Sequence, residues 1–183
     1  IGKEITWGFV NKFCTINEKY QLLGFLFGDS YLCARRFGIS VKLNPQKEKE
    51  IFDVLMKYGF KQEDCGNIYK GKSFLESDLQ IDLGFLGDNT LDKSIPDSIL
   101  FGDYNKLGSF ISGLFEANGS VTKSNGQISF KSVSKKLVQQ LQISLGFFGI
   151  ESWIVTNKEY PVTWSNGTYT SNQSYNLQIA PRN

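Results

Sequence analysis

The chain contains no histidine, and this absence excludes several kinds of site. An imidazole is the usual base of serine and cysteine triads, and it is a frequent ligand of zinc. The chain also has few cysteines: Cys14, Cys33 and Cys65 are odd in number and lack the spacing of metal ligands. We therefore expect reduced cysteines that serve in packing, without a disulfide framework.

Long hydrophobic runs are missing as well. The most apolar stretch, residues 22–28, is far shorter than the about 20 residues that span a bilayer. No signal peptide pattern is present, so we expect an intracellular protein, in the cytoplasm or nucleoid, or in a eukaryotic nucleus or organelle. The 40% hydrophobic content is enough for one sizeable core or for two small cores that share an interface.

Acidic residues are absent from two stretches, 30–46 and 117–150, although the net charge is only +2. The basic residues of these stretches are Arg35, Arg36, Lys42, Lys123, Lys131, Lys135 and Lys136. Local clusters of positive charge are typical of surfaces that attract nucleic acids.

Two apolar, glycine-containing stretches stand out: LLGFLFGDS at 22–30 and ISGLFEANG at 111–119. A helix with so small a polar face must be buried on nearly all sides. Small residues recur one turn apart in both stretches, at Gly24 and Gly28 and at Gly113 and Ala117. Such a stripe lets a second backbone approach closely. We therefore expect the two helices to pack against each other.

The same two stretches set the register of an internal repeat. An offset of 89 pairs Gly24 with Gly113, Asp29 with Asn118 and 39–42 with 128–131, and one inserted residue then pairs 58–60 with 148–150. Agreement at three separated places indicates a tandem pair of related units. We expect a lead-in over 1–19, a first repeat with its connector over 20–108, and a second repeat over 109–183.

Both repeats are predicted to follow the order αββαββα. For the first we expect a helix over 17–29 with Asn17 as N-cap, strands over 31–35 and 38–43, a helix from Pro45 to Tyr58 closed by Gly59, a strand pair within 60–72 and a helix over 74–85. For the second we expect a hairpin over 121–131 with a type I′ turn at Asn125-Gly126, a helix over 134–146, and a hairpin over 151–179 that turns at Asn166-Gly167. The second repeat is short, so we expect its last helix to be missing.

These residues resemble a known family. LLGFLFGDS and ISGLFEANG are similar to the paired LAGLIDADG motifs of homing endonucleases. Further similarities are Lys93-Ser94-Ile95-Pro96, a connector of the intein-associated branch, Phe110 before the second motif, and LQISLGFFGI at 141–150. The resemblance covers roughly residues 20–179. It implies an α+β fold, the LAGLIDADG homing-endonuclease fold, in which a pseudo-twofold tandem repeat of αββαββα units forms two saddle-shaped antiparallel sheets within one monomer.

The resemblance also implies a site at the C-terminal ends of the motif helices. Asp29 would bind a divalent metal, Mg²⁺ or Mn²⁺, with the Gly28 carbonyl beside it, and Asn118 and Ala117 hold the equivalent places. A helix C-terminus already carries partial negative charge, so a cation would stabilise a carboxylate there. The metal would activate water and neutralise charge on the phosphate. The alternative for Asp29 is an ordinary water-exposed carboxylate at a helix end.

Asn118 departs from the family pattern, because an acid is expected at this position. Its amide oxygen can coordinate a hard cation but adds no charge, so we expect weaker metal binding there. Glu116 faces nearly the opposite side of the helix and is no obvious substitute. Lys93 resembles the connector lysine that assists catalysis, where a fixed cation would stabilise the reacting phosphate. The alternative for Lys93 is a solvated loop lysine.

The resemblance implies that the hairpins bind DNA, since a two-stranded ribbon fits the major groove. The candidate contacts are Arg35, Arg36, Lys42, Lys123, Lys131, Asn172, Asn176 and Gln178. The late hairpin is expected to present Thr168, Thr170, Asn172, Ser174, Asn176 and Gln178 on one face. The alternative is a set of ordinary half-exposed strands.

The leading hypothesis is a site-specific double-strand DNA endonuclease of intein origin, acting as a monomer on a long asymmetric site and not on a membrane. We expect no protein splicing from these residues, because Ile1 is no splicing nucleophile and histidine is absent. Asn118 keeps open a catalytically weakened DNA-binding module or an RNA maturase. A pseudo-dimeric scaffold without a nucleic-acid partner is disfavoured by the basic hairpins.

Overall fold

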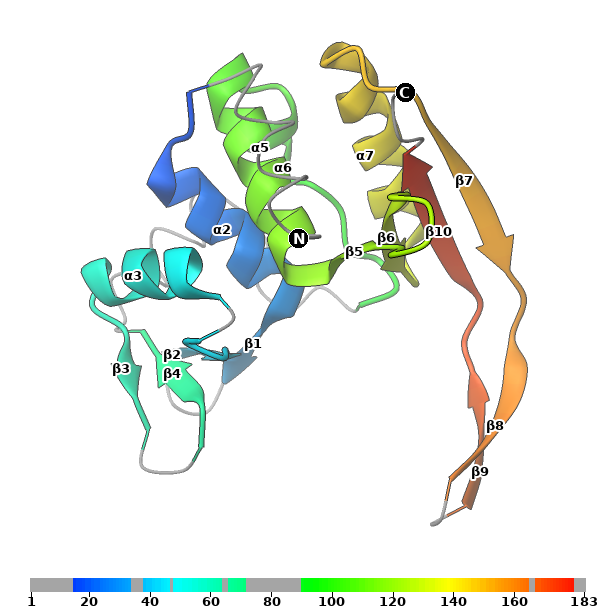
Figure 1. Cartoon of the computed structure of the whole chain (residues 1–183), viewed down its shortest axis with the longest axis horizontal. Helices are drawn as coiled ribbons and strands as arrows, with labels where there is room; N and C mark the ends of the chain where they lie inside the picture. Colours follow the sequence, from blue (N-terminus) through cyan, green and yellow to red (C-terminus); the bar gives the residue numbers. More distant parts are fainter. Residues whose placement is uncertain are drawn as a thin grey trace. The chain divides into compact units, whose positions relative to one another are not determined.

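A computed structural model describes residues 15–33, 38–46, 48–63, 66–71, 90–164 and 167–179 (Figure 1). These residues form two compact units. The helix-pair unit contains the described residues of 15–71 together with 96–118, and the C-terminal unit contains 90–95 and 119–179. The helix expected over 74–85 and most of the lead-in lie outside the described residues.

The helix-pair unit is built on two long helices and one sheet. Its helices are α2 (Glu18–Asp29), α3 (Lys49–Lys57), α5 (Asp97–Leu100) and α6 (Tyr104–Asn118). Its strands are β1 (Ser30–Cys33), β2 (Gly38–Lys42), β3 (Lys61–Gln62) and β4 (Ile68–Lys70). The strands form an antiparallel sheet in the order β1-β2-β4-β3. The short helix α5 was not expected from the sequence.

The ends of α2 and α3 follow local chemistry. Asn17 is the predicted N-cap of α2, and its Oδ1 accepts a hydrogen bond from the Lys19 amide at 3.1 Å. Helix α3 begins at Lys49 instead of Pro45, because residues 44–46 form a turn in which Asn44 Oδ1 accepts from the Gln46 amide. Lys57 of α3 donates to the Glu18 carboxylate of α2. This hydrogen bond and the attraction between the two charges raise the pKa of Lys57.

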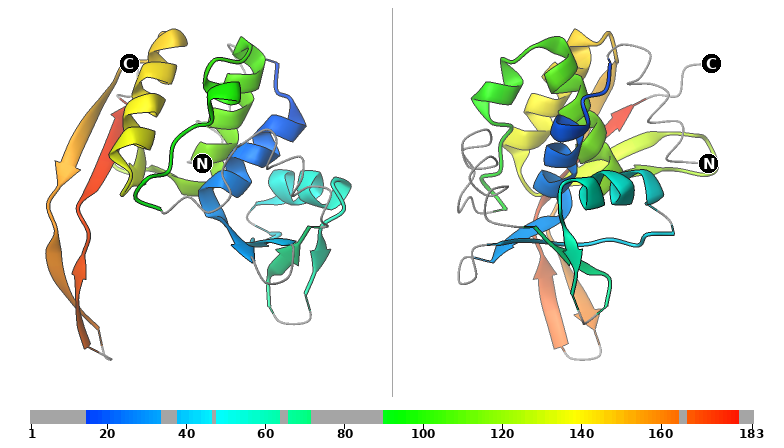
Figure 2. Two further views of the ribbon diagram at one scale, coloured as in Figure 1. Left: turned by 180° about the vertical axis from the view of Figure 1, so that it is seen from behind. Right: turned by 90° about the vertical axis from the view of Figure 1, so that its left-hand side faces the viewer.

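The C-terminal unit consists of one helix on a sheet that extends into a ribbon. Its elements are β5 (Gly119–Val121), β6 (Ile128–Ser132), α7 (Lys135–Phe147), β7 (Ser152–Asn157), β8 (Tyr160–Trp164), β9 (Gly167–Ser171) and β10 (Ser174–Ile179). The sheet order is β5-β6-β10-β7, and β8 and β9 pair separately. Figure 2 shows α7 along one face of the sheet and the β8–β9 ribbon reaching beyond it. Leu137, Leu141 and Leu145 of α7 are buried, as their four-residue spacing predicts.

The repeat predicted from the sequence is visible at the ends of α3 and α7. Gly59 and Gly149 follow these helices with φ of 81° and 69°, values that favour glycine. The Phe60 amide donates to the Leu55 carbonyl at 3.3 Å, and the Ile150 amide donates to the Leu145 carbonyl at 3.0 Å. Both helices therefore end in the same hydrogen-bonded arrangement, at the offset that the sequence gives.

Both predicted hairpin turns differ from the sequence expectation. Gly167 belongs to β9 and pairs with Trp164, so the late hairpin does not turn at Asn166-Gly167. The β5–β6 hairpin turns through residues 123–126, with the Gly126 amide bonded to the Thr122 carbonyl at 2.8 Å, so it is not a two-residue type I′ turn. The two compact units are defined by contacts, and α6 of the second repeat, predicted over 109–183, packs against α2 of the first, predicted over 20–108. Units defined by contacts need not coincide with units defined by a sequence repeat, so the predicted domain boundaries stay a prediction. In the part of the chain described here, no helix combines the length and hydropathy needed to cross a membrane.

Candidate functional site

The two motif helices, α2 and α6, meet along a seam without side chains. A Cβ added to Gly24 would lie 1.9 Å from the Phe110 carbonyl oxygen, and one added to Gly113 would lie 1.8 Å from the Gln21 carbonyl oxygen. The two contacts are equivalent in the repeat. The offset of 89 pairs Gly24 with Gly113, and it pairs Gln21 with Phe110, the two residues whose carbonyl groups face these glycines. The backbones therefore touch at positions that only glycine can occupy, as the spacing of small residues predicted.

Side chains pack on either side of this helix contact and form hydrogen bonds near the N-terminal end of α2. The Phe27 and Phe110 rings lie 5.5 Å apart between centroids, and both are fully buried. At the start of α2 the Asn17 amide donates to Ser109 Oγ at 2.9 Å, and Ser109 Oγ donates to the Asn105 carbonyl at 2.6 Å. These contacts fix the axial register of the helices and so determine which residues meet at their C-terminal ends.

At the C-terminal ends, the seam reaches the candidate site. A Cβ on Gly28 would lie 2.5 Å from the Ala117 Cβ, so these two residues are in close contact. Asn118 Nδ2 donates to the Gly28 carbonyl at 3.1 Å, across the two helices. The Gly28 carbonyl is one of the last four of α2, which have no partner within their own helix. The Asn118 amide therefore supplies a proton donor that a carboxylate at this position could not supply.

Both helices bring candidate cation ligands to this end. Asp29 brings a carboxyl group to the last position of α2, and Asn118, whose side chain is exposed, keeps its Oδ1 as a possible ligand next to the Gly28 carbonyl. All three are oxygen donors of the kind that Mg²⁺ and Mn²⁺ prefer. Among the side chains that the structure describes, no three of His, Cys, Asp or Glu come together, and the side chain of Asp29 lies outside that description. The metal roles predicted for Asp29, Gly28, Ala117 and Asn118 stay predictions.

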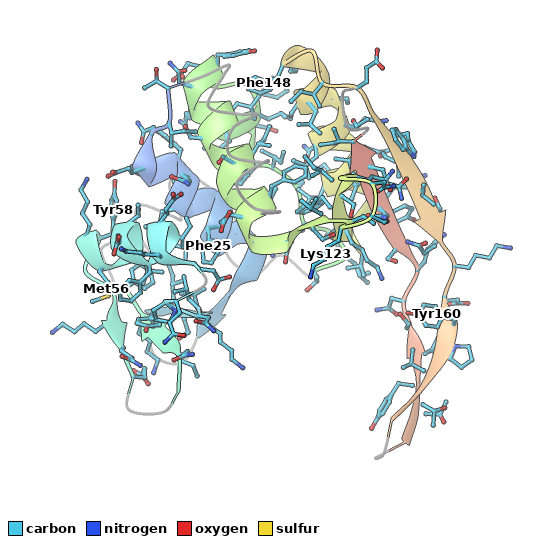
Figure 3. The ribbon with its side chains drawn as sticks, viewed as in Figure 1. Phe25, Met56, Tyr58, Lys123, Phe148 and Tyr160 are labelled. Carbon is cyan, nitrogen blue, oxygen red and sulfur yellow. The ribbon has the colours of Figure 1, made fainter. Side chains whose placement is uncertain are left out.

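A second group of predicted residues lies on the two sheets. Lys42 at the end of β2 and Lys131 on β6 occupy equivalent places in the repeat, and both side chains are exposed. Lys123 is exposed in the loop between β5 and β6 (Figure 3). Arg35 and Arg36 lie outside the described residues. The structure thus places one basic side chain at the same point of each sheet, and the DNA-binding roles of these lysines stay predictions.

The late hairpin keeps a single register through both of its segments. Asn157 of β7 pairs with Ser174 of β10, and Tyr160 of β8 pairs with Ser171 of β9, an equal step along each strand. No residue is inserted on either side, although residues 158–159 and 172–173 between the two segments lie outside the strands. Thr168 and Thr170 share one face of the ribbon, and Ser174, Asn176 and Gln178 share one face of the sheet, where Ser174 is buried. The single continuous face expected from the sequence stays a prediction. Asn172 itself lies between β9 and β10 and is exposed.

Lys93 belongs to the C-terminal unit, whereas Asp29 and Asn118 belong to the helix-pair unit. The Lys93 carbonyl accepts a hydrogen bond from Ser134 Oγ at 2.6 Å, and the Ile95 amide donates to Gln140 Oε1 at 2.7 Å. The connector is thus attached to the first turns of α7. The catalytic role expected of Lys93 stays a prediction.

Sequence reasoning missed some residues of both sheet faces. Lys61 and Lys70 pair across β3 and β4 and alternate onto the same face as Lys42. Trp153 and Val155 of β7 are 41% and 38% exposed on the face that carries Asn176 and Gln178. These lysines and apolar residues could have been assigned to the two faces only if the strand register had been known.

Comparison with known proteins agrees with this architecture. Residues 105–178 match the model of the LAGLIDADG-like domain. The homing endonuclease I-DmoI, crystallised with DNA and Mn, has a TM-score of 0.54 at 17% identity, covering 89% of this chain and 89% of its own; it was also crystallised with DNA and Ca. The N-terminal LAGLIDADG domain of DUF199/WhiA has a TM-score of 0.53 at 16% identity, covering 99% of this chain and 84% of its own.

A curated relative is the glutamine–fructose-6-phosphate aminotransferase of Methanocaldococcus jannaschii, 24% identical over 159 residues. The match takes in 81% of this chain but only 14% of the length of that protein. Taken together, the fold and the paired helices define an α+β protein with two motifs in one chain. Residues 105–178 match the LAGLIDADG-like domain, and the chain as a whole has the LAGLIDADG homing-endonuclease fold.

Proposed function

We propose that the chain is a site-specific, metal-dependent DNA endonuclease that cleaves one strand faster than the other. The observation that carries this proposal is the meeting of unlike residues at the ends of α2 and α6. Asp29 ends α2 with a carboxyl group, and Asn118 ends α6 with an amide that is bonded to the Gly28 carbonyl. A long asymmetric DNA duplex is the proposed substrate, and the chain acts on it as a monomer.

The residues of the chain have separable tasks in this function. The exposed lysines of β2 and β6 hold the phosphate backbone, and the polar face of the late hairpin lies along the major groove. Asp29, the Gly28 carbonyl and Asn118 Oδ1 would hold Mg²⁺ or Mn²⁺. When bound, such an ion supplies an acidified water and charge compensation at the phosphate. Asn118 also holds the two helix ends together through its amide protons, independently of any ion.

The solved relatives support a DNA substrate and a divalent ion, because I-DmoI was crystallised with DNA together with Mn or Ca. The match covers only 14% of the aminotransferase, and this small share supports an intein origin. An intein inserted into a host enzyme would give this arrangement, because its endonuclease domain would form a small part of a protein named for another reaction. The Lys93-Ser94-Ile95-Pro96 connector points in the same direction. Sequencing the gene around this chain for flanking splicing blocks tests the origin.

Strand-resolved cleavage tests the function. The protein is incubated with a randomised plasmid library and Mg²⁺ or Mn²⁺, new ends are sequenced, and the recovered site is labelled on each strand. We expect nicked product to accumulate before linear product. Asp29→Asn should abolish cleavage of both strands. Asn118→Asp should raise the rate of cleavage at the slowly cut strand, because a second carboxylate strengthens the binding of a hard cation.

The control variant is Asn118→Ala, which loses the hydrogen bond to Gly28 without adding charge. We expect it to lower stability without any gain in cleavage. Equal cutting of both strands by the wild type, with no gain in Asn118→Asp, would show that the amide is a full substitute for the acid.

A DNA-binding module without cleavage is the second candidate, and the Asn118 hydrogen bond favours it. The amide satisfies the Gly28 carbonyl with a proton, so the helix ends are stabilised without an ion. Tight, sequence-selective binding with no cleavage by the wild type or by Asn118→Asp would support this candidate over the endonuclease.

A further inference from the structure

The face of the C-terminal sheet turned away from α7 has an unusual composition for a DNA-contacting surface. Its side chains, assigned by alternation and cross-strand pairing, are Ser120, Ser129, Lys131, Trp153, Val155, Asn157, Ser174, Asn176 and Gln178. One of these nine residues is charged, and none is arginine. The opposite face carries the buried side chains of Phe130, Leu177 and Ile179. A partner on the polar face is therefore recognised mainly by amides, hydroxyls and carbon groups.

Cross-strand neighbours divide this face into two chemistries. Asn176 of β10 lies directly between Lys131 of β6 and Val155 of β7. In the next row Gln178 lies between Ser129 and Trp153. The amides are thus on the inner strand, and the exposed apolar groups are on the edge strand. Directly opposed residues have Cβ atoms about 4.5–5.5 Å apart, so each amide and its apolar neighbour can contact one base pair or two adjacent ones.

We infer that this face selects A·T pairs in the half-site that it contacts, with Asn176 on adenine and Val155 on the neighbouring thymine. This inference rests on the proposed DNA-binding function. An asparagine amide can pair with the adenine N7 acceptor and N6 donor, and an apolar side chain can contact the thymine C5 methyl group. Both features lie in the major groove of an A·T pair, and the guanine-reading arginine fork is absent from the face.

Asn176 is better placed for this role than Gln178. The Gln178 Oε1 already accepts a hydrogen bond from Gln127 Nε2 at 3.4 Å, which holds that amide toward the β5–β6 side. Lys131 lies beyond the end of β5, which pairs only with residues 128–130 of β6. Lys131 is exposed at this position, where an ammonium group suits a phosphate contact.

Atomic substitution in the DNA tests the assignment. Duplexes bound by the wild-type chain are first selected from a random library, with cleavage suppressed by Ca²⁺. In the consensus site, each thymine is then replaced by deoxyuridine, which lacks the C5 methyl, and each adenine by 7-deazaadenine, which lacks the N7 acceptor. We expect one deoxyuridine to weaken binding of the wild type about threefold to fivefold, the usual effect of one buried carbon group. One nearby 7-deazaadenine should weaken binding about fivefold or more.

The variants assign each loss to a residue. Val155→Ala should bind the deoxyuridine duplex as well as the thymine duplex, and Asn176→Ala should likewise be insensitive to the 7-deazaadenine. Ile143→Ala is the matched control, because Ile143 is also an exposed aliphatic residue, at 59%, but lies on α7. It should retain the full sensitivity of the wild type.

The outcomes separate this inference from the proposed function. If selection recovers no preferred sequence and binding is undetectable, the DNA-binding function itself fails. If a preferred site is recovered, but G·C pairs respond to Asn176→Ala and Val155→Ala or no position responds, the function stands and the A·T assignment is wrong.

Discussion

Glycine at the centre of the motif seam is the residue on which the whole arrangement depends. Gly24 and Gly113 each face a backbone oxygen of the other helix at a distance that leaves no room for a methyl group. The chain cannot relieve such a contact by turning a side chain, because the obstructing atom is backbone. Any substitution must push the helices apart.

We predict that Gly24→Ala and Gly113→Ala each lower the free energy of unfolding by about 1–3 kcal/mol or more. Gly146→Ala is the matched control, since Gly146 is also helical but an added Cβ there meets nothing within 4 Å. It should be neutral or stabilising by up to about 1 kcal/mol, because alanine favours the helix. Denaturant titration followed by circular dichroism measures all three. Unchanged stability of Gly24→Ala would contradict the packed-seam description.

The seam was predictable from spacing alone, whereas the hydrogen bond of Asn118 was not. Four-residue spacing of small side chains in two apolar stretches has one simple structural meaning, so Gly24, Gly28, Gly113 and Ala117 could be assigned before any coordinates. The direction of an amide side chain depends on where the opposite helix ends. Only the structure shows that the Asn118 amide donates to the Gly28 carbonyl.

At the scale of single elements, α7 illustrates how one residue joins two segments. Ser134 is fully buried, and its Oγ accepts from the Leu137 amide at 3.2 Å while donating to the Lys93 carbonyl at 2.6 Å. The first bond caps the helix, and the second holds the connector. The sequence indicated a helix start at this serine, but the link to a residue 41 positions earlier needed tertiary information.

We predict that Ser134→Ala destabilises the chain by about 0.5–2 kcal/mol through the lost cap, with an added loss from the Lys93 carbonyl. Hydrogen exchange should accelerate at the first turn of α7 and in residues 93–95 together. Ser134→Thr keeps the hydroxyl and should retain most of the protection. Faster exchange in the helix alone would show that the connector is held by other contacts, such as those of Gln140 with Ile95.

Helices and hairpins were predicted well where local signals were strong, and poorly where they were weak. Caps, closing glycines and leucine spacing gave α2, α3 and α7 to within a few residues. The short helix α5 has few such signals and follows Pro96 within a segment interpreted as a connector. The β5–β6 turn was assigned from the Asn125-Gly126 pair, but its length is set by the register of the strands on either side.

At the scale of the whole molecule, the proposed DNA binding depends on how charge is distributed. Lys42 and Lys131 are exposed at equivalent places on two sheets, and Lys61 and Lys70 extend the basic face of the first. Lys70 is partly neutralised by its ion pair with Glu63. When lysines neutralise DNA phosphates, counterions bound to the DNA are released. We expect this release to provide most of the contribution of these lysines to affinity.

We predict a steep, linear fall of the logarithm of the DNA association constant with the logarithm of salt concentration. Lys131→Ala should reduce the slope by about 1 while leaving the preferred sequence unchanged. Lys57→Ala is the control, because that lysine is already bonded to Glu18 and should leave the slope as it is. Fluorescence anisotropy across a salt series gives the slopes, and a flat plot for the wild type would contradict a phosphate-contacting surface.

The unbroken register of residues 152–179 has an evolutionary consequence. Inward and outward side chains alternate along β7 and β10, so a mutation on the outer face of the sheet leaves the inner neighbours in place, whereas most residues of β9 are exposed. A single-residue insertion in one strand would instead exchange the two faces for the rest of that strand. If the outer face contacts DNA as inferred above, point substitution at every second residue of β7 and β10 would change the preferred target. Changes of length are tolerated chiefly at the far end of the hairpin, where residues can be added in pairs.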